Sequence, residues 1–222
     1  MRSFDELLID AAAMHRGCVC PGQVLGVRMA MLGCRLLGID EPTQEKHLIV
    51  YVETDRCMAD AIAAVTGCRL GKHTLKHIDY GKCACTFVDT KTGRAVRISA
   101  GDDAREYVWC YVPLGLDKSE VQREAYKVMP DDDLFVVQEV VVHTPDHDRP
   151  GRPLSRVPCA ICGEGINDRR EVQLNGLLLC RACAQGSYYH LIVSILPENS
   201  KYDESKPETI PSLEGNAFLR SA

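Results

Sequence analysis

The segment CAICGEGINDRREVQLNGLLLCRAC, from Cys159 to Cys183, determines the structure of the C-terminal part of the chain. It contains two Cys-x-x-Cys pairs, and their separation places four thiolates where one tetrahedral metal ion can bind them all. The predicted ligands are Cys159, Cys162, Cys180 and Cys183. The pattern favours zinc. Two disulfides and a rubredoxin-like iron site are the alternatives that use the same residues.

The residues between the two pairs predict a small hairpin. Asn175-Gly176 is a strong two-residue turn signal within 172–179, and the second pair opens a predicted helix over 182–189. Knuckle, hairpin and helix follow one another in the order of a treble-clef zinc finger, which this segment resembles. A closed four-thiolate site has no open coordination position, so we expect the ion to stabilise the segment rather than to catalyse a reaction.

Outward from the finger, the chain divides into four predicted parts. Pro150, Gly151 and Pro153 mark a linker before the finger, and a polar stretch with further prolines marks a tail after it. The predicted parts are a core domain over 1–145, the linker over 146–157, the finger over 158–196 and the tail over 197–222.

The core domain carries helical patterns early and strand patterns later. Ser3 and Glu6 have the spacing of a capping box, and Gly67 is placed to end the third helix. Predicted helices cover 3–14, 21–38, 55–67 and 119–129, and predicted strands cover 47–53, 74–80, 83–89, 94–99 and 134–143. We expect the last strand to be well buried. This order predicts an α+β core domain followed by a small treble-clef zinc-finger domain, rather than a doubly wound sheet.

Composition narrows the classes of function. The 222 residues carry a formal net charge of -5 and a pI near 5.8, so the chain has no overall attraction to nucleic acid or to anionic membrane. No apolar run approaches the roughly 20 residues of a membrane span, and the first residues lack the order of a signal peptide. We therefore expect a cytoplasmic protein, in which twelve cysteines indicate metal or thiol chemistry.

A second group of candidate residues lies in the first 70 positions. Cys20 precedes the predicted second helix and Cys57 lies in the first turn of the third, where the helix dipole lowers the pKa of a thiol. Asp60 stands one turn beyond Cys57, so Cys57 and Asp60 are the candidate catalytic residues. The candidate metal ligands of the core are Cys18, Cys20, Cys57, Cys68 and His15, whose sulfur and imidazole groups suit a second transition metal, zinc included.

Other cysteines and histidines are interpreted as structural. Cys34 and Cys110 are expected to be small buried hydrophobes, the usual role of an isolated cysteine. His47, His73 and His77 are interpreted as surface or structural residues. The Cys-x-x-Cys-x-x-Cys run of an iron–sulfur cluster is absent from the core sequence.

Four motifs follow one another through the first 100 residues. They are Cys20-Pro21-Gly22 with Gly26 and Arg28, Thr54-Asp55-Arg56-Cys57 with Asp60-Ala61-Ile62, Thr66-Gly67-Cys68 with Gly71-Lys72, and Tyr80-Gly81-Lys82. In this order they resemble FmdE, a family of formylmethanofuran dehydrogenase subunits, some members of which also carry a C-terminal treble-clef finger. The resemblance implies an α+β core, a homodimer, and a cleft lined by these Cys and Asp residues that can bind a metal. Two positions depart from the family: many members have His where this chain has Cys18, and another His commonly stands at Arg16.

Three functions follow as hypotheses. The first, implied by the resemblance, is a metal-binding accessory protein of a molybdenum- or tungsten-dependent formylmethanofuran dehydrogenase or related redox enzyme, with the subunits of that enzyme as partners. The second is an enzyme in its own right that uses the cleft of Cys20, Cys57 and Asp60. The third is a regulator that binds nucleic acid or protein through the finger, with nucleic acid the less favoured of the two. The sequence has no dinucleotide fingerprint, P-loop or ferredoxin motif, so we do not expect it to carry out the dehydrogenase reaction alone.

Overall fold

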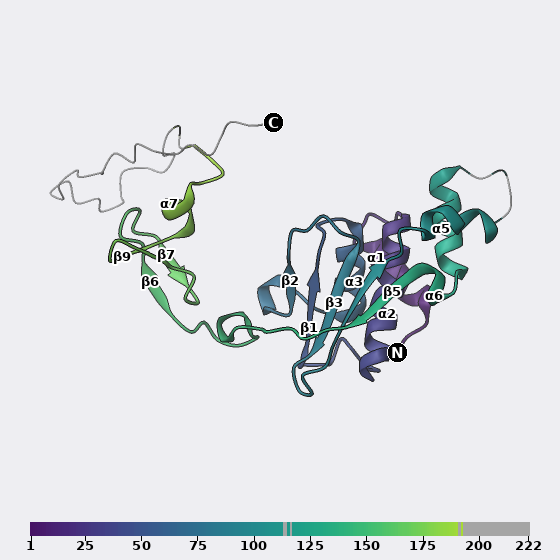
Figure 1. Cartoon of the computed structure of the whole chain (residues 1–222), viewed down its shortest axis with the longest axis horizontal. Coiled ribbons are helices and arrows are strands. Elements are labelled where there is room, and N and C mark those ends of the chain that lie inside the picture. The colour runs from purple at the N-terminus through teal and green to yellow at the C-terminus, as the bar shows by residue number, and fades with distance from the viewer. Residues whose placement is uncertain (113–114, 116, 191, 193–222) are drawn as a thin grey trace.

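A computed structural model of the chain describes residues 1–112, 115, 117–190 and 192. These residues form a mixed core of helices and one sheet, which an extended segment joins to a small cysteine-rich unit (Figure 1). The predicted tail over 197–222 lies outside the described residues. The boundaries of the four predicted parts stay predictions.

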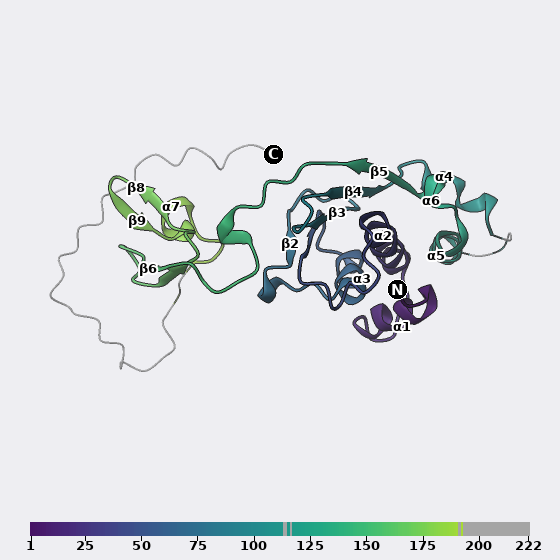
Figure 2. The same ribbon diagram turned by 90° about the horizontal axis from the view of Figure 1, so that it is seen from below.

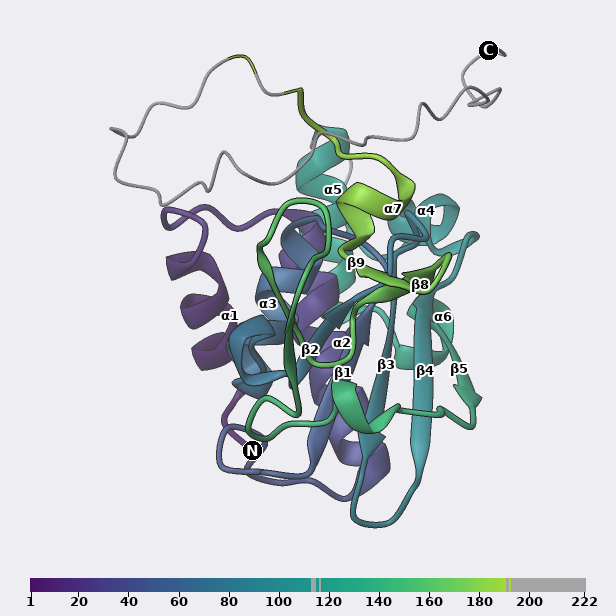
Figure 3. The same cartoon turned by 90° about the vertical axis from the view of Figure 1, so that its left-hand side faces the viewer.

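One five-stranded sheet organises the core. Its strands are β1 (Leu48–Val52), β2 (Leu75–His77), β3 (Ala84–Asp89), β4 (Ala95–Ala100) and β5 (Phe135–Glu139). They lie in the order β2-β1-β3-β4-β5, which Figure 3 shows across the sheet. β2 is parallel to β1, and the other neighbouring pairs are antiparallel.

Helices cover one face of this sheet. α1 (Phe4–Ala13), α2 (Pro21–Leu37) and α3 (Cys57–Thr66) lie on the same side (Figure 2), and α5 (Lys118–Val128) packs against α2. Side chains alternate along a strand, so Val50 points into the helical layer and Ile49 points to the opposite face. On that opposite face Val140 and Val142, from the chain after β5, pack against the strands.

The predicted end signals of the helices are confirmed. Ser3 and Glu6 form a capping box at the start of α1. Gly38 and Gly67 end α2 and α3 in the left-handed conformation, with φ of 72° and 70°. None of the helices in the described residues combines the length and apolar character needed to cross a membrane.

Glycines let α2 approach its neighbours closely. A Cβ added at Gly26 would lie 2.5 Å from the carbonyl oxygen of Met58 on α3, and one at Gly33 would lie 2.3 Å from the ring of Phe87 on β3. Because real Cβ contacts are longer, only glycine permits this packing. The contact between α2 and α3 therefore depends on particular residues of α2.

The expectation that the last strand is well buried is wrong. In β5 only Phe135 is buried, and Val136 and Val137 are half exposed. The reason is that β5 is an edge strand, beyond the area that the three helices cover. Cys110 is also exposed, against expectation, because it lies in the 3₁₀ turn η2 (Val108–Cys110), whereas Cys34 is buried as expected.

Several short elements were not predicted. They are the helices α4 (Ala104–Tyr107) and α6 (Asp131–Leu134), and the 3₁₀ turns η1 (Leu70–Lys72) and η3 (Asp146–Asp148). Each has only three or four residues, too few for a periodic pattern to appear in the sequence.

We predict that Gly26→Ala destabilises the core, because the added Cβ would meet Met58 and Ala61 on α3. Overpacking of this kind costs about 1–3 kcal/mol of the free energy of unfolding. Urea denaturation followed by circular dichroism measures the loss. The control is Gly71→Ala, where the added Cβ has no neighbour within 4 Å. Equal midpoints for both variants would contradict the packing argument.

Candidate metal centres

The four predicted finger cysteines converge in one cluster. The sulfur atoms of Cys159, Cys162, Cys180 and Cys183 all lie within 4.8 Å of one another. Those of Cys162 and Cys180 are 3.9 Å apart. A tetrahedral ion with Zn–S bonds of about 2.3 Å holds its sulfurs about 3.8 Å apart. The cluster therefore has the dimensions of a single zinc site.

Short strands and tight turns build this cluster. β6 (Arg156–Pro158) pairs with β7 (Gly165–Asn167), and β8 (Val172–Leu174) pairs with β9 (Leu177–Leu179). The β6–β7 pair was not predicted. The turn at Asn175-Gly176 was, and both of its residues have positive φ, 50° and 78°, as a type I′ turn requires.

The last cysteine pair opens a helix, as predicted, but a shorter one. α7 (Arg181–Gln185) has Cys180 as its N-cap and ends at Gly186, before the predicted end at 189. Gly186 has φ of 98°, a conformation that favours glycine and stops the helix. Beside the sulfurs, Ile166 and Leu179 form a small apolar cluster with Cys159.

Backbone N–H groups stabilise charge on the sulfurs. The N–H of Cys180 donates to Sγ of Cys159 at 3.3 Å, and that of Cys183 donates to Sγ of Cys180 at 3.4 Å. Burial alone would raise the pKa of Cys159, but such backbone donors, that of Cys162 foremost, lower it to about 6. Burial and the neighbouring thiols raise the pKa of Cys183 to about 12, because they disfavour a second negative charge. A divalent cation is the group that compensates several thiolates at once.

In the core, the structure brings two of the five candidate ligands together. Sγ of Cys20 lies 2.9 Å from Sγ of Cys57, and both residues are half-buried. Cys20 is the N-cap of α2 and Cys57 is the first residue of α3, as the sequence predicted. The starts of two adjacent helices therefore meet at one pair of sulfurs, which we call the core thiol pair.

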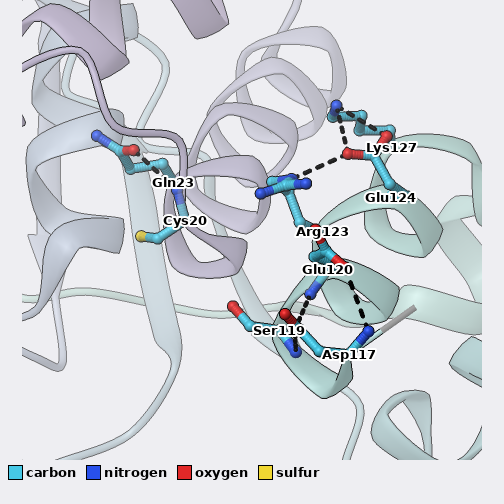
Figure 4. Close-up of polar contacts among 8 residues, drawn as sticks. All are labelled: Cys20, Gln23, Asp117, Ser119, Glu120, Arg123, Glu124 and Lys127. Carbon is cyan, nitrogen blue, oxygen red and sulfur yellow. Dashed lines mark hydrogen bonds and ion pairs between the residues drawn. The ribbon is translucent and has the colours of Figure 1, made fainter.

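Two neighbours hold the core thiol pair in place. A Cβ at Gly22 would lie 2.6 Å from Sγ of Cys57, so this position admits only glycine. Gln23 is fully buried: its Oε1 accepts the N–H of Cys20 at 3.2 Å, and its Nε2 donates to the carbonyl oxygen of Ala11 at 2.8 Å. Figure 4 shows the contact of Gln23 with Cys20, beside the capped start of α5. Gln23 thus fixes the start of α2 against α1.

The expectation that the helix start lowers the pKa of Cys57 is wrong. Burial and the contact with the Cys20 thiol raise this pKa to about 12. The backbone N–H groups of Cys57 and Met58 act in the opposite direction and are outweighed. The physical reason is that two sulfurs in contact resist carrying two negative charges.

The other candidate residues lie apart from the core thiol pair. Cys18 and His15 are exposed in the turn before α2, and Asp60 is exposed on α3. Cys68 is buried beyond the far end of α3, a helix about 15 Å long. Among the described residues, only the finger cysteines form a group of three or more potential ligands. In this structure the core thiol pair therefore offers two protein ligands.

Sequence reasoning missed a buried ion pair at the same end of the sheet. Glu53, only 5 % exposed, accepts two hydrogen bonds from the guanidinium of Arg97, at 2.7 and 2.8 Å. Glu53 is also separated by only three residues from the helix that Cys57 begins. The available signal was a carboxylate at the end of an apolar strand, where burial demands a cationic partner.

Two family models match the chain. Residues 15–137, more than half of the 222, match the family FmdE, described as molybdenum formylmethanofuran dehydrogenase operon. Residues 152–189 match the prokaryotic dksA/traR C4-type zinc finger. The first match includes the core thiol pair, and the second includes all four clustered cysteines.

Individual proteins resemble the chain as well. A probable S-adenosyl-L-methionine-binding protein from Archaeoglobus fulgidus is 34% identical over 106 residues, which are 46% of this chain and 29% of that protein. The chain therefore spans less than a third of this relative. A crystal structure of an FmdE-like protein of tungsten formylmethanofuran dehydrogenase, from Syntrophus aciditrophicus, matches with a TM-score of 0.56 and 22% identity, over 85% of this chain and 96% of that one. The latter likeness confirms the predicted fold class.

We predict that Cys159→Ala removes one zinc per chain, because three thiolates cannot close the tetrahedral site. Metal analysis after dialysis against a chelator measures the loss. Limited trypsin digestion should then cut within the finger and leave the core intact, since the ion stabilises only the finger. The control is Cys110→Ala, an exposed thiol outside the cluster. Unchanged zinc in Cys159→Ala would contradict the four-thiolate site.

Proposed function

The chain belongs to the FmdE family, and we propose that it is a metal-binding accessory protein of a molybdenum- or tungsten-dependent redox enzyme. The observation that carries this proposal is the core thiol pair, two half-buried sulfurs 2.9 Å apart at the starts of two helices. The description of the family refers to a molybdenum formylmethanofuran dehydrogenase operon, and the FmdE-like protein of Syntrophus aciditrophicus is named after a tungsten enzyme. Both names support the class of partner.

The residues of the core thiol pair fit a soft transition metal. Cys20 and Cys57 offer two thiolates, a ligand type that suits zinc, copper, iron or nickel. Two helix starts direct their dipoles at the sulfurs, and Gly22 leaves the space beside Cys57 free of a side chain. When bound, such an ion would supply a Lewis acid or a redox centre, according to its identity. Gln23 would hold Cys20 in position for it.

Two protein ligands leave coordination positions for a group from outside. In the proposed complex this group comes from a subunit of the redox enzyme or from a second copy of the chain. We therefore propose a homodimer that docks on the enzyme in the cytoplasm. The finger differs in kind, because its four thiolates fill a tetrahedral ion and leave no position open.

The same open positions favour a second candidate function, a stand-alone enzyme in which a substrate completes the coordination. Cys57 would then be a metal ligand or the nucleophile, with Asp60 as the acid or base. In this structure Asp60 is exposed on α3. Turnover by the isolated chain that Cys57→Ser and Asp60→Asn both abolish would favour this alternative over the accessory role.

We predict about two metal ions per chain in protein purified without oxygen, one for the finger and one for the core thiol pair. Cys57→Ala should lose one ion and keep the finger zinc, because it removes one of only two protein ligands in the core. Metal analysis by mass spectrometry gives both counts, and Cys110→Ala is the control. One ion per chain in both the wild type and Cys57→Ala would sink the core site.

The accessory role has its own test. Tagged full-length chain, isolated from its native host without oxygen, should recover molybdenum or tungsten together with the subunits of the enzyme that holds it. Cys57→Ala should recover less of that enzyme if the shared ion helps to join the two proteins. Recovery of neither metal, from cells that contain the enzyme, would rule out the accessory role without affecting the metal count of the chain itself.

A further inference from the structure

A pocket of about 500 Å³ opens where β3 begins and β4 ends. Its lining includes three cationic side chains from three different elements: Lys82 from the loop before β3, Arg97 from β4 and Arg105 from α4. The volume is that of a small-molecule site. We call it the cationic pocket.

The cationic pocket has an excess of positive charge. Asp102 also lines it, and Glu53 neutralises Arg97 from behind, so three cations face two carboxylates. Lys82 and Arg105 form no ion pair with any carboxylate of the described residues. A local excess of +1 stands out in a chain of net charge -5, because the overall field otherwise repels anions.

Buried contacts hold the pocket in shape. Glu53 fixes the guanidinium of Arg97 through two hydrogen bonds, and Gln138 accepts a third from Arg97 Nη1 at 3.1 Å. Since a guanidinium has five N–H groups, two of them remain for a ligand. The backbone N–H of Lys82 donates to the carbonyl oxygen of Glu53 at 3.0 Å, which anchors the loop that carries the second cation.

We propose that the cationic pocket binds the oxyanion group, a carboxylate or a phosphate, of a small molecule. The free N–H groups of Arg97 and Arg105 have the fork geometry that recognises such groups, and Lys82 adds a point charge. The pocket has room for a molecule larger than the oxyanion itself. This inference goes beyond the proposed metal function and does not depend on it.

Cys83 provides a built-in reporter. Its thiol is exposed and lines the cationic pocket. Iodoacetate and iodoacetamide alkylate a thiolate in the same way: sulfur attacks the methylene carbon, an S–C bond forms, the C–I bond breaks and iodide leaves. Only iodoacetate carries a carboxylate. The ratio of the two rates at Cys83 therefore measures attraction of an anion and cancels the reactivity of the thiol.

We predict that this ratio at Cys83 exceeds that of the neutral model thiol N-acetylcysteine amide by about fivefold or more at low salt. Peptide mass spectrometry on the full zinc-loaded chain measures each rate. Lys82→Gln and Arg105→Gln should each lower the ratio about threefold, because each removes one exposed charge at the pocket. Lys91→Gln, which removes an exposed charge at the far β3–β4 turn, is the matched control and should leave the ratio unchanged.

Competition identifies the type of oxyanion. Inorganic phosphate or acetate, added at constant ionic strength, should slow iodoacetate at Cys83 and leave the control thiol unaffected. Stronger protection by phosphate indicates a phosphorylated ligand, and stronger protection by acetate indicates a carboxylate ligand. A ratio at Cys83 equal to that of the model thiol, with no protection by either anion, would overturn the proposal whatever the metal content of the protein.

Discussion

The close contact of α2 with α3 is the constraint on which the rest of the core depends. Gly22 and Gly26 lie one turn apart on α2, and a Cβ at either would collide with α3 at Cys57 or Met58. Without side chains at these positions, the two helices start side by side. Their first residues then bring Cys20 and Cys57 together. The packing that closes the hydrophobic core is therefore also the packing that forms the core thiol pair.

The two groups of sulfurs meet the same electrostatic difficulty with different means. In the finger, turns direct backbone N–H groups at Cys159 and Cys180, and four thiolates surround one point. In the core, two helix starts face two sulfurs, yet burial and mutual contact still raise the pKa of Cys57. The finger is complete within one chain, because its ligands fill a tetrahedron. The core thiol pair is open, which suits contact with another molecule.

Local signals in the sequence predicted local structure well. The capping box of Ser3 and the turn at Asn175-Gly176 require only neighbouring residues, and both are confirmed. Burial was predicted less well because it depends on the whole sheet: β5 is apolar in sequence but lies at an edge, so Val137 is exposed. The same limit applies to the site. Helix starts placed Cys20 and Cys57 correctly, whereas the separation of Cys68 from them and the pairing of Glu53 with Arg97 arise only when distant segments fold together.

The end of the sheet at which β1 stops links the core thiol pair to the cationic pocket. Glu53 follows β1 directly and binds Arg97, and after three more residues the chain enters α3 at Cys57. The carbonyl oxygen of Glu53 also accepts the N–H of Lys82, so both cationic residues contact the same partner. A buried carboxylate that lost its guanidinium partner would be strongly unfavourable, which keeps this arrangement rigid. The loop between Glu53 and Cys57 is consequently anchored at both ends, by an ion pair at one and by close helix packing at the other, and it spaces the two sites at a fixed separation.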